Sequence, residues 1–175
     1  ARAMRALVLL DLLKVYSKIP TQEARDVLSS LGMPVVENTD PNYQAVRPDL
    51  QTSYTYVVNE LEDAKALMFD NNGPTRIDKQ TASAMLTRAY LYLGNYPKVI
   101  QNANEVTQEV ASRDNFSDIW TDSSVDGVLL KVDQDRNLDG VTVGVPYSQS
   151  SESGLIPEYA VTSEFFQKFQ PSEFV

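Results

Sequence analysis

Apolar residues that recur at helical spacing through the middle of the chain constrain its fold more than any other feature. Three successive segments show the i, i+3, i+4 pattern of a helix with one buried face. The stripes are Leu50, Tyr54, Val57, Val58, Leu61, Ala64 and Met68; Ala82, Met85, Leu86, Ala89 and Leu93; and Val99, Ile100, Ala103, Val106 and Val110. Because each stripe must be buried against a neighbouring element, the pattern predicts helices packed side by side.

Helix start and stop signals divide these segments. Pro48 suits the first turn of a helix that ends before the breaker Asn71-Asn72-Gly73-Pro74. Asp78 is a suitable N-cap, and Gly94 supplies the left-handed residue that ends many helices. Pro97 fits the first turn of the next helix. We therefore predict helices over residues 48–69, 78–93 and 96–110.

The first segment, residues 1–16, is apolar on almost every side, which predicts a largely buried core helix ending before Pro20. No part of the chain has the roughly 18 uncharged apolar residues that a membrane-spanning helix needs. Residues 21–47 contain many turn formers and are predicted to be mostly loop, with a short helix around residues 22–28.

The chain changes character after Ser112. Val128–Val132 and Val141–Val145 are predicted strands of a hairpin, with Asp139-Gly140 in the turn. Residues 148–154 are predicted to be loop and residues 162–169 a short helix. The predicted fold class is mainly α: antiparallel helix hairpins in a helical-repeat region, residues 1–112, and a small β-hairpin and loop-rich part, residues 113–175, packed on it within one domain.

Composition excludes several kinds of function. The chain has no Cys and no His, which removes thiol nucleophiles, Ser-His-Asp triads and zinc sites built on Cys or His. Its formal net charge of −9 disfavours nucleic acid and anionic membrane surfaces as partners. Neutral ligands such as sugars remain open.

The stretch Ala89–Ile100 resembles a tetratricopeptide repeat, with a Gly at the turn between two helices and a Tyr two residues later. In such a hairpin Gly94 turns the chain, Tyr96 fills the gap between the helices, and Ala89 and Ala103 permit close approach.

A longer series of segments is similar to the SusD/RagB family of outer-membrane glycan-binding lipoproteins, in the family's order and over nearly the whole chain. The segments are Arg5-Ala6-Leu7 through Lys18-Ile19-Pro20; Arg47 and Tyr54 through Leu67; Arg76 through Tyr96; Trp120 with Val128–Val132; and Glu158-Tyr159 through Phe169.

The resemblance implies a cell-surface lipoprotein that binds glycan for carbohydrate uptake, together with a TonB-dependent outer-membrane transporter, and that has no catalytic activity. The family's lipid-bearing Cys is not among these residues, and we expect the chain to be a piece of a longer protein. Its four matching arginines, Arg5, Arg47, Arg76 and Arg88, are expected to form ion pairs or helix-end contacts.

Aromatic residues outside the predicted helices are the candidates for stacking on sugar rings. The candidate ligand-binding residues are Tyr43, Asn42, Trp120, Tyr147 and Tyr159. Tyr43 leads because it lies in the long first loop, whereas Trp120 and Tyr159 fall in the structural segments of the family, where a core residue is the better interpretation. Phe165, Phe166 and Phe169 are expected in the core.

Two groups of acidic residues are candidates for metal binding or catalysis. Asp133, Asp135, Asn137 and Asp139 place oxygen ligands on alternate residues, as in a calcium loop, but the closing Glu is missing and an ordinary acidic turn is the alternative. No other cofactor is expected. Glu60, Glu62 and Asp63 could in principle hydrolyse a glycosidic bond, but a solvated helix face explains them better. The alternative to glycan binding is a helical-repeat module that binds another protein.

Overall fold

The computed structural model describes residues 1–22, 26–133, 148–151, 154–157 and 159–169. The chain divides into two compact units, Ala1–Val132 and Asp133–Val175, which are described separately. The division predicted at residue 112 stays a prediction.

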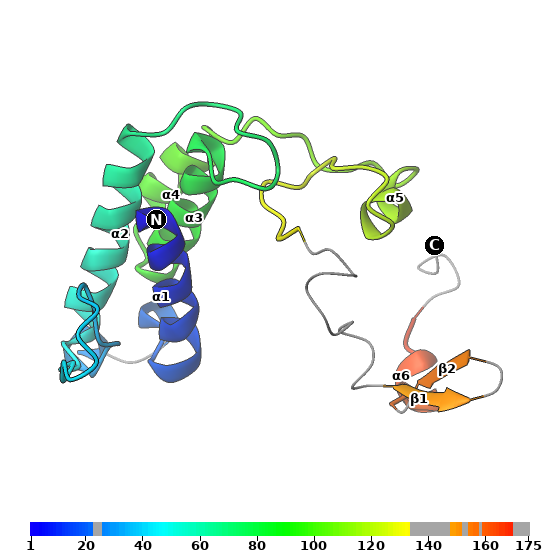
Figure 1. Cartoon of the computed structure of the whole chain (residues 1–175), viewed down its shortest axis with the longest axis horizontal. Helices are drawn as coiled ribbons and strands as arrows, with labels where there is room; N and C mark the ends of the chain where they lie inside the picture. Colours follow the sequence, from blue (N-terminus) through cyan, green and yellow to red (C-terminus); the bar gives the residue numbers. More distant parts are fainter. Residues whose placement is uncertain (23–25, 134–147, 152–153, 158, 170–175) are drawn as a thin grey trace. The chain divides into compact units, whose positions relative to one another are not determined.

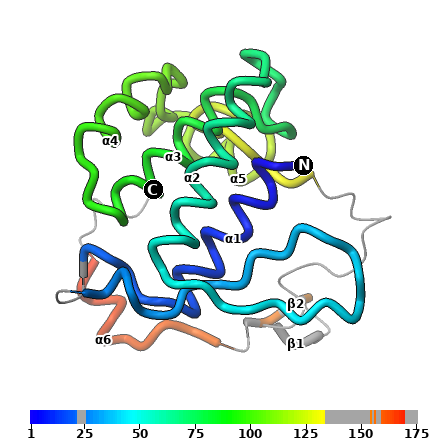
Figure 2. Tube along the Cα trace, turned by 90° about the vertical axis from the view of Figure 1, so that its left-hand side faces the viewer, coloured from blue at the N-terminus to red at the C-terminus, as the bar shows by residue number. Residues whose placement is uncertain are grey.

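Four helices form the body of the first unit. They are α1 (Arg2–Tyr16), α2 (Leu50–Ala66), α3 (Lys79–Tyr92) and α4 (Tyr96–Ala103). Figures 1 and 2 show α1, α2 and α3 side by side, and α4 folds back on α3. The predicted mainly α architecture of paired helices is confirmed. A fifth, short helix, α5 (Phe116–Trp120), follows after a connection without regular structure.

The helix ends follow the predicted capping chemistry closely. The Asp78 carboxylate accepts a hydrogen bond from the Thr81 N–H at 2.9 Å, so it caps α3. Gly94 follows the last turn of α3 with φ +70°, the left-handed conformation expected there. At α2 the prediction needs correction, because Asp49 is the N-cap and Pro48 precedes it. The Asp49 carboxylate accepts from the Thr52 N–H at 2.6 Å.

The core lies where α2 packs between α1 and α3. Its buried members are Ala3, Ala6, Leu9, Leu10, Leu13, Leu50, Tyr54, Val57, Leu61, Ala64, Met85, Leu86, Ala89 and Tyr90. The predicted stripes of α2 and α3 supply most of these residues. Burial raises the pKa of Tyr90 to about 12, so its hydroxyl stays protonated at neutral pH and donates to Glu62 at 3.2 Å.

Arginines of α1 pair with a buried carboxylate on the inner face of α2. Glu60 is buried, and its carboxylate accepts a hydrogen bond from the Arg5 guanidinium. That guanidinium also lies 5.6 Å from the centre of the Tyr56 ring, in a cation–π contact. The predicted solvated face is therefore wrong for Glu60. The expected arginine contacts are confirmed for Arg5 and also for Arg47, which donates to the Gly32 and Tyr16 carbonyls.

A polar network ties the end of α4 to α2 and α3. The Lys65 ammonium contacts the Glu105 carboxylate and donates to the Asn102 side-chain oxygen at 3.1 Å. The Ser83 hydroxyl donates to Glu105 at 2.7 Å, and both Ser83 and Asn102 are buried. These hydrogen bonds, that of Lys65 first, lower the pKa of Glu105 below its ordinary value.

Three sequence-based predictions about the helices are wrong. First, α1 is buried on one face only, so the core helix predicted for residues 1–16 has an exposed opposite face. Second, α4 ends at Ala103, because the N–H groups of Thr107 and Gln108 donate to the side chain of Gln80 instead of to helical carbonyls. Third, Tyr96 and Ala103 are exposed, so neither fills the α3–α4 crossing.

The short helix predicted around residues 22–28 is instead two single 3₁₀ turns, at Pro20–Gln22 and Val27–Ser29, and residues 23–25 lie outside the described residues.

Residues 128–132 are not a strand, which corrects the predicted hairpin. The Lys131 N–H donates to the Pro74 carbonyl at 2.7 Å, and the Leu129 carbonyl accepts from the Thr81 hydroxyl at 3.0 Å. Pro74 has no N–H to donate in return, so no ladder forms there. The other predicted strand, residues 141–145, lies outside the described residues.

The second unit contains two short antiparallel strands, β1 (Ser148–Ser151) and β2 (Gly154–Pro157), paired with Ser148 opposite Pro157 and Ser151 opposite Gly154. Residues 148–151 were predicted to be loop, so that prediction is wrong. Helix α6 (Ser163–Phe166) is capped by the Thr162 hydroxyl, which accepts from the Phe165 N–H. Phe165, Phe166 and Phe169 are about half exposed rather than buried in a core.

We predict that Arg5→Ala destabilises the chain by about 2 kcal/mol, because the buried Glu60 carboxylate loses its hydrogen-bonded cation and keeps only the more distant Arg2, at 3.9 Å. The control is Lys79→Ala, which removes a surface pair with Asp70 and is expected to cost about 0.5 kcal/mol. Urea unfolding of both variants measures the difference. Equal losses would show that the Arg5–Glu60 pair is no more important than a surface contact.

The Glu105 network predicts a pH dependence. The pKa of the Glu105 carboxyl is lower in the folded chain than in the unfolded chain, where it is about 4.3. The ionised carboxylate therefore stabilises the fold above about pH 4.3, and this stabilisation is lost as the pH falls through the folded-state pKa. When the pH is lowered from about 7 to about 3, the free energy of unfolding falls for both proteins. We expect this fall to be about 1 kcal/mol smaller in Glu105→Gln than in the unmodified chain, because the variant has no carboxylate to protonate at this position. Parallel curves for the two proteins would contradict this.

Candidate functional site

Two adjoining cavities form a polar cleft on the first unit, beside the N-terminal end of α3. The larger, about 440 Å³, is lined by the segment after α4 and by Asn115 and Asp126. The smaller, about 240 Å³, is lined in part by Asn71, Gln80 and Gln108. Gln108 belongs to both cavities. We call these two cavities together the polar cleft.

Side-chain hydrogen bonds hold the walls of the polar cleft in place. The Gln80 side-chain oxygen accepts from the N–H groups of Thr107 and Gln108 at 2.8 and 2.9 Å. On the opposite wall, the Asn115 amide donates to the Asp126 carboxylate at 2.6 Å. The Ser112 hydroxyl donates to the Asn115 oxygen at 2.9 Å. A connection that lacks regular structure is thereby ordered by amide and carboxylate groups.

Gly127 allows the two walls to approach each other. It has φ +74°, and a Cβ at this position would lie 2.9 Å from the backbone N of Ala111. Any other residue would be strained by the left-handed backbone conformation, and its Cβ would also clash with the backbone of Ala111. Gly127 therefore permits a close approach of the backbone to Ala111, which lies between the cleft residues Val110 and Ser112.

An exposed aromatic pair stands next to the polar cleft. Helix α5 starts directly after the cleft residue Asn115, and its five residues span about 7 Å. Trp120 at its end is 78% exposed, and its ring meets that of Phe116 edge-on, with centroids 6.2 Å apart. An exposed indole that lies one short helix after a polar cleft can stack on an apolar ligand face while the amides of the cleft bind hydroxyl groups.

The predicted ligand-binding residues do not lie together in one site. Trp120 is the one that lies next to the polar cleft, and its alternative assignment as a core residue is wrong. Tyr43 is half exposed in a turn before α2, where the Asn42 N–H donates to the Asp40 carboxylate; neither Tyr43 nor Asn42 lines the cleft. Tyr159 is exposed in the second unit, which corrects its core alternative too.

Several predicted residues lie outside the described residues. These are the ligand-binding candidate Tyr147 and three of the four calcium candidates, Asp135, Asn137 and Asp139. Asp133 is described and exposed. Among the described residues, no three acidic side chains converge as metal ligands, and no helix is long and apolar enough to cross a membrane. The calcium loop stays a prediction.

Sequence reasoning missed the polar cleft itself. Gln80, Gln108, Asn115 and Asp126 come from three separate segments, so no local motif joins them. The apolar stripe that continues through Val106 and Val110 predicted a helix in this segment, so no local signal marked it as a wall of the cleft.

We predict that Gly127→Ala costs about 2 kcal/mol, from backbone strain plus the contact with Ala111. The matched control is Gly73→Ala, which has φ +77° but no atom within 4 Å of the added Cβ. That variant is expected to cost about 1 kcal/mol. Urea unfolding compares the two, and an equal cost would mean that close approach at Gly127 is unimportant.

Neither models of protein families nor curated proteins match the sequence. Solved structures do match. A SusD superfamily protein from Bacteroides thetaiotaomicron is 24% identical, with a TM-score of 0.58 over 67% of this chain. A SusD superfamily protein from Bacteroides vulgatus is 24% identical, with a TM-score of 0.58 over 70% of this chain. A SusD-like carbohydrate binding protein from the same species is 18% identical, with a TM-score of 0.55 over 66%.

This chain spans only 27%, 29% and 25% of the length of those three structures. At such identities the likeness shows the fold. The chain has the mainly α-helical, SusD-like fold that its sequence motifs predicted.

Proposed function

We propose that this chain binds a neutral glycan at the cell surface, without a chemical step, and that it does so beside α5. The observation that carries the proposal is the exposed Trp120 next to the polar cleft. Support comes from the SusD-like fold, because one protein with that fold is described as carbohydrate-binding. Residues outside this chain could complete the site, since the chain spans about a quarter of the matched structures.

The chemistry of the proposed site fits a sugar. A pyranose ring has an apolar face of C–H groups and a rim of hydroxyl groups. The indole of Trp120 offers a flat apolar surface for the ring face. Gln108, Asn115 and Asp126 offer both donors and acceptors for hydroxyl groups.

Charge favours a neutral ligand over an acidic one. Glu109 and Asp126 line the larger cavity, while no Lys or Arg among the residues that the structure describes lines either cavity of the polar cleft. The formal net charge of −9 acts in the same direction over longer distances. A uronate or sulfated sugar would therefore be repelled, whereas hydroxyl groups can donate to these carboxylates.

The cellular setting is part of the same proposal. A SusD-like chain would act at the outer membrane as a lipid-anchored protein next to a TonB-dependent transporter, passing captured oligosaccharide to it for uptake. The lipid anchor would lie outside these 175 residues. Support for this setting is the resemblance of the sequence motifs and the fold.

The alternative is a helical-repeat module that binds another protein and no sugar. The two functions differ in what happens at Trp120. Glycan binding beside α5 changes the environment of the indole, whereas protein binding on the helix faces leaves it unchanged.

Trp120 is the only Trp of the chain, so its fluorescence reports on this site alone. We expect a neutral oligosaccharide from a panel of bacterial and plant glycans to shift or quench this fluorescence, and acidic glycans to have no effect. Calorimetric titration of Trp120→Ala should show affinity reduced at least about tenfold, equivalent to about 1.4 kcal/mol. Trp120→Phe, which keeps a ring, should retain part of the affinity.

Tyr16→Ala is the control, because Tyr16 is an exposed aromatic residue at the end of α1 and does not line the polar cleft. Its affinity should equal that of the unmodified chain. Unchanged affinity in Trp120→Ala, or a panel in which no neutral glycan binds, would reject the proposed site.

A further inference from the structure

Helix α1 carries a second apolar stripe on the face opposite the core. Met4, Val8, Leu12 and Val15 recur at i, i+4, i+8 and i+11, the spacing of one helix face. They are 45%, 52%, 36% and 72% exposed. The stripe runs along most of α1. We call it the outer stripe.

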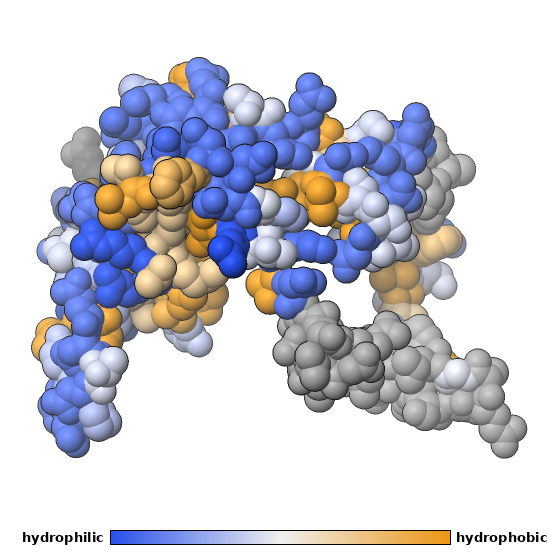
Figure 3. All heavy atoms as spheres, turned by 45° about the horizontal axis from the view of Figure 1, so that its top comes forward, coloured by the Kyte–Doolittle hydropathy of each residue, from blue (hydrophilic) through white to orange (hydrophobic). Residues whose placement is uncertain are grey.

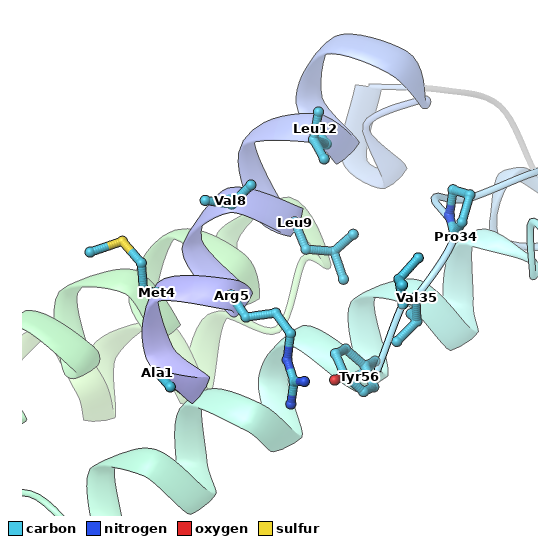
Figure 4. Close-up of a pocket in the computed structure, with 10 residues that line it drawn as sticks. Ala1, Met4, Arg5, Val8, Leu9, Leu12, Pro34, Val35 and Tyr56 are labelled. Atoms are coloured by element: carbon cyan, nitrogen blue, oxygen red, sulfur yellow. The ribbon is translucent and has the colours of Figure 1, made fainter. Parts of the chain in front are cut away.

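A groove extends this apolar surface beyond the helix. It has a volume of about 470 Å³ and lies between α1 and the extended segment around Val35, with Leu9 and Tyr56 in its walls. Figure 4 shows Leu9 pointing toward Val35, and Met4 and Val8 pointing outward from α1. In Figure 3, hydrophobic side chains gather on the part of the surface where Figure 1 draws α1.

The cation in this groove is already neutralised. Arg5 lines the groove, but its guanidinium is paired with Glu60. The groove therefore offers apolar contact and no free charge among the described residues. An apolar side-chain row fits this surface better than a sugar or a charged peptide.

The position of α1 in the fold explains what such a surface is for. Helices α1, α2, α3 and α4 pack in chain order, each against the next, so α1 is the end of the row. In repeat folds an end helix either carries a polar outer face or is covered by another helix. The outer stripe is apolar, so α1 has the surface of an internal helix rather than of a cap.

The matched structures contain enough polypeptide to provide the cover. This chain spans 25–30% of their lengths, so most of each such protein lies outside the portion matched here. We propose that a further amphipathic helix of the same polypeptide, outside these 175 residues, packs on the outer stripe and fills the groove beside Val35. This inference is independent of the proposed glycan site.

The absence of Cys from the chain gives a direct test. Val8→Cys places the only thiol of the chain on the outer stripe, and Thr55→Cys places one on an exposed position of α2 as a control. Maleimide labelling is followed in the 175-residue chain and in the natural open reading frame that contains it, with the labelled peptide read by mass spectrometry.

We expect Val8→Cys to label at least tenfold more slowly in the longer polypeptide than in the 175-residue chain, while Thr55→Cys changes less than twofold. Equal labelling of Val8→Cys in both proteins, or an equal slowing at both positions, would overturn the proposal. So would an open reading frame that encodes no helix beyond these residues.

Sedimentation of the 175-residue chain tests the competing occupant, a second copy. A dimer that Val8→Glu converts to monomer would replace the proposed helix with a self-association surface. A monomer whose Val8→Cys thiol labels freely agrees with the proposal. Because the outer stripe is exposed in this chain, Val8→Glu is expected to leave its folding intact by circular dichroism.

Discussion

Burial of the inner face of α2 is the interaction on which the rest of the structure depends. Leu50, Tyr54, Val57 and Leu61 are completely buried between α1 and α3. Neither neighbouring helix could hide its own apolar face without α2, since α1 and α3 make little direct contact. At about 1.5–3 kcal/mol for each large side chain, these few residues contribute more than the surface ion pairs do.

Polar groups are buried in this fold where they join elements. Glu60 follows the same spacing as the apolar residues of α2, so its carboxylate points into the helix interface and requires the Arg5 cation. At the far end of the bundle, Lys65 and Ser83 contact the Glu105 carboxylate, and Lys65 also donates to the buried Asn102. Each pair or network fixes which helices are neighbours, because an unpaired buried charge would cost several kcal/mol.

The helices support the candidate site, but most of its residues come from the connections between them. The helices supply Gln80 at the start of α3, and the connections around it supply Gln108, Asn115 and Asp126. Those connections have few apolar residues to bury, so hydrogen bonds to side chains order their backbone. Trp120 stays exposed because the five-residue helix that carries it contains no residue buried in the core.

The amino-acid sequence determined the number of main helices, their partners in the core and several of their caps. The helical spacing of apolar residues and the capping residues Asp78 and Gly94 are local signals. They act between residues that are close in the sequence, so they hold whatever the tertiary structure is. The tertiary structure alone decided that α4 stops at Ala103 and that residues 128–132 form no strand. It also decided that Glu60 is buried and that Trp120 stands beside a polar cleft. These features depend on contacts between residues far apart in the chain, such as Gln80 with Thr107, Lys131 with Pro74 and Arg5 with Glu60. A single sequence does not show which distant residues will meet in the folded chain.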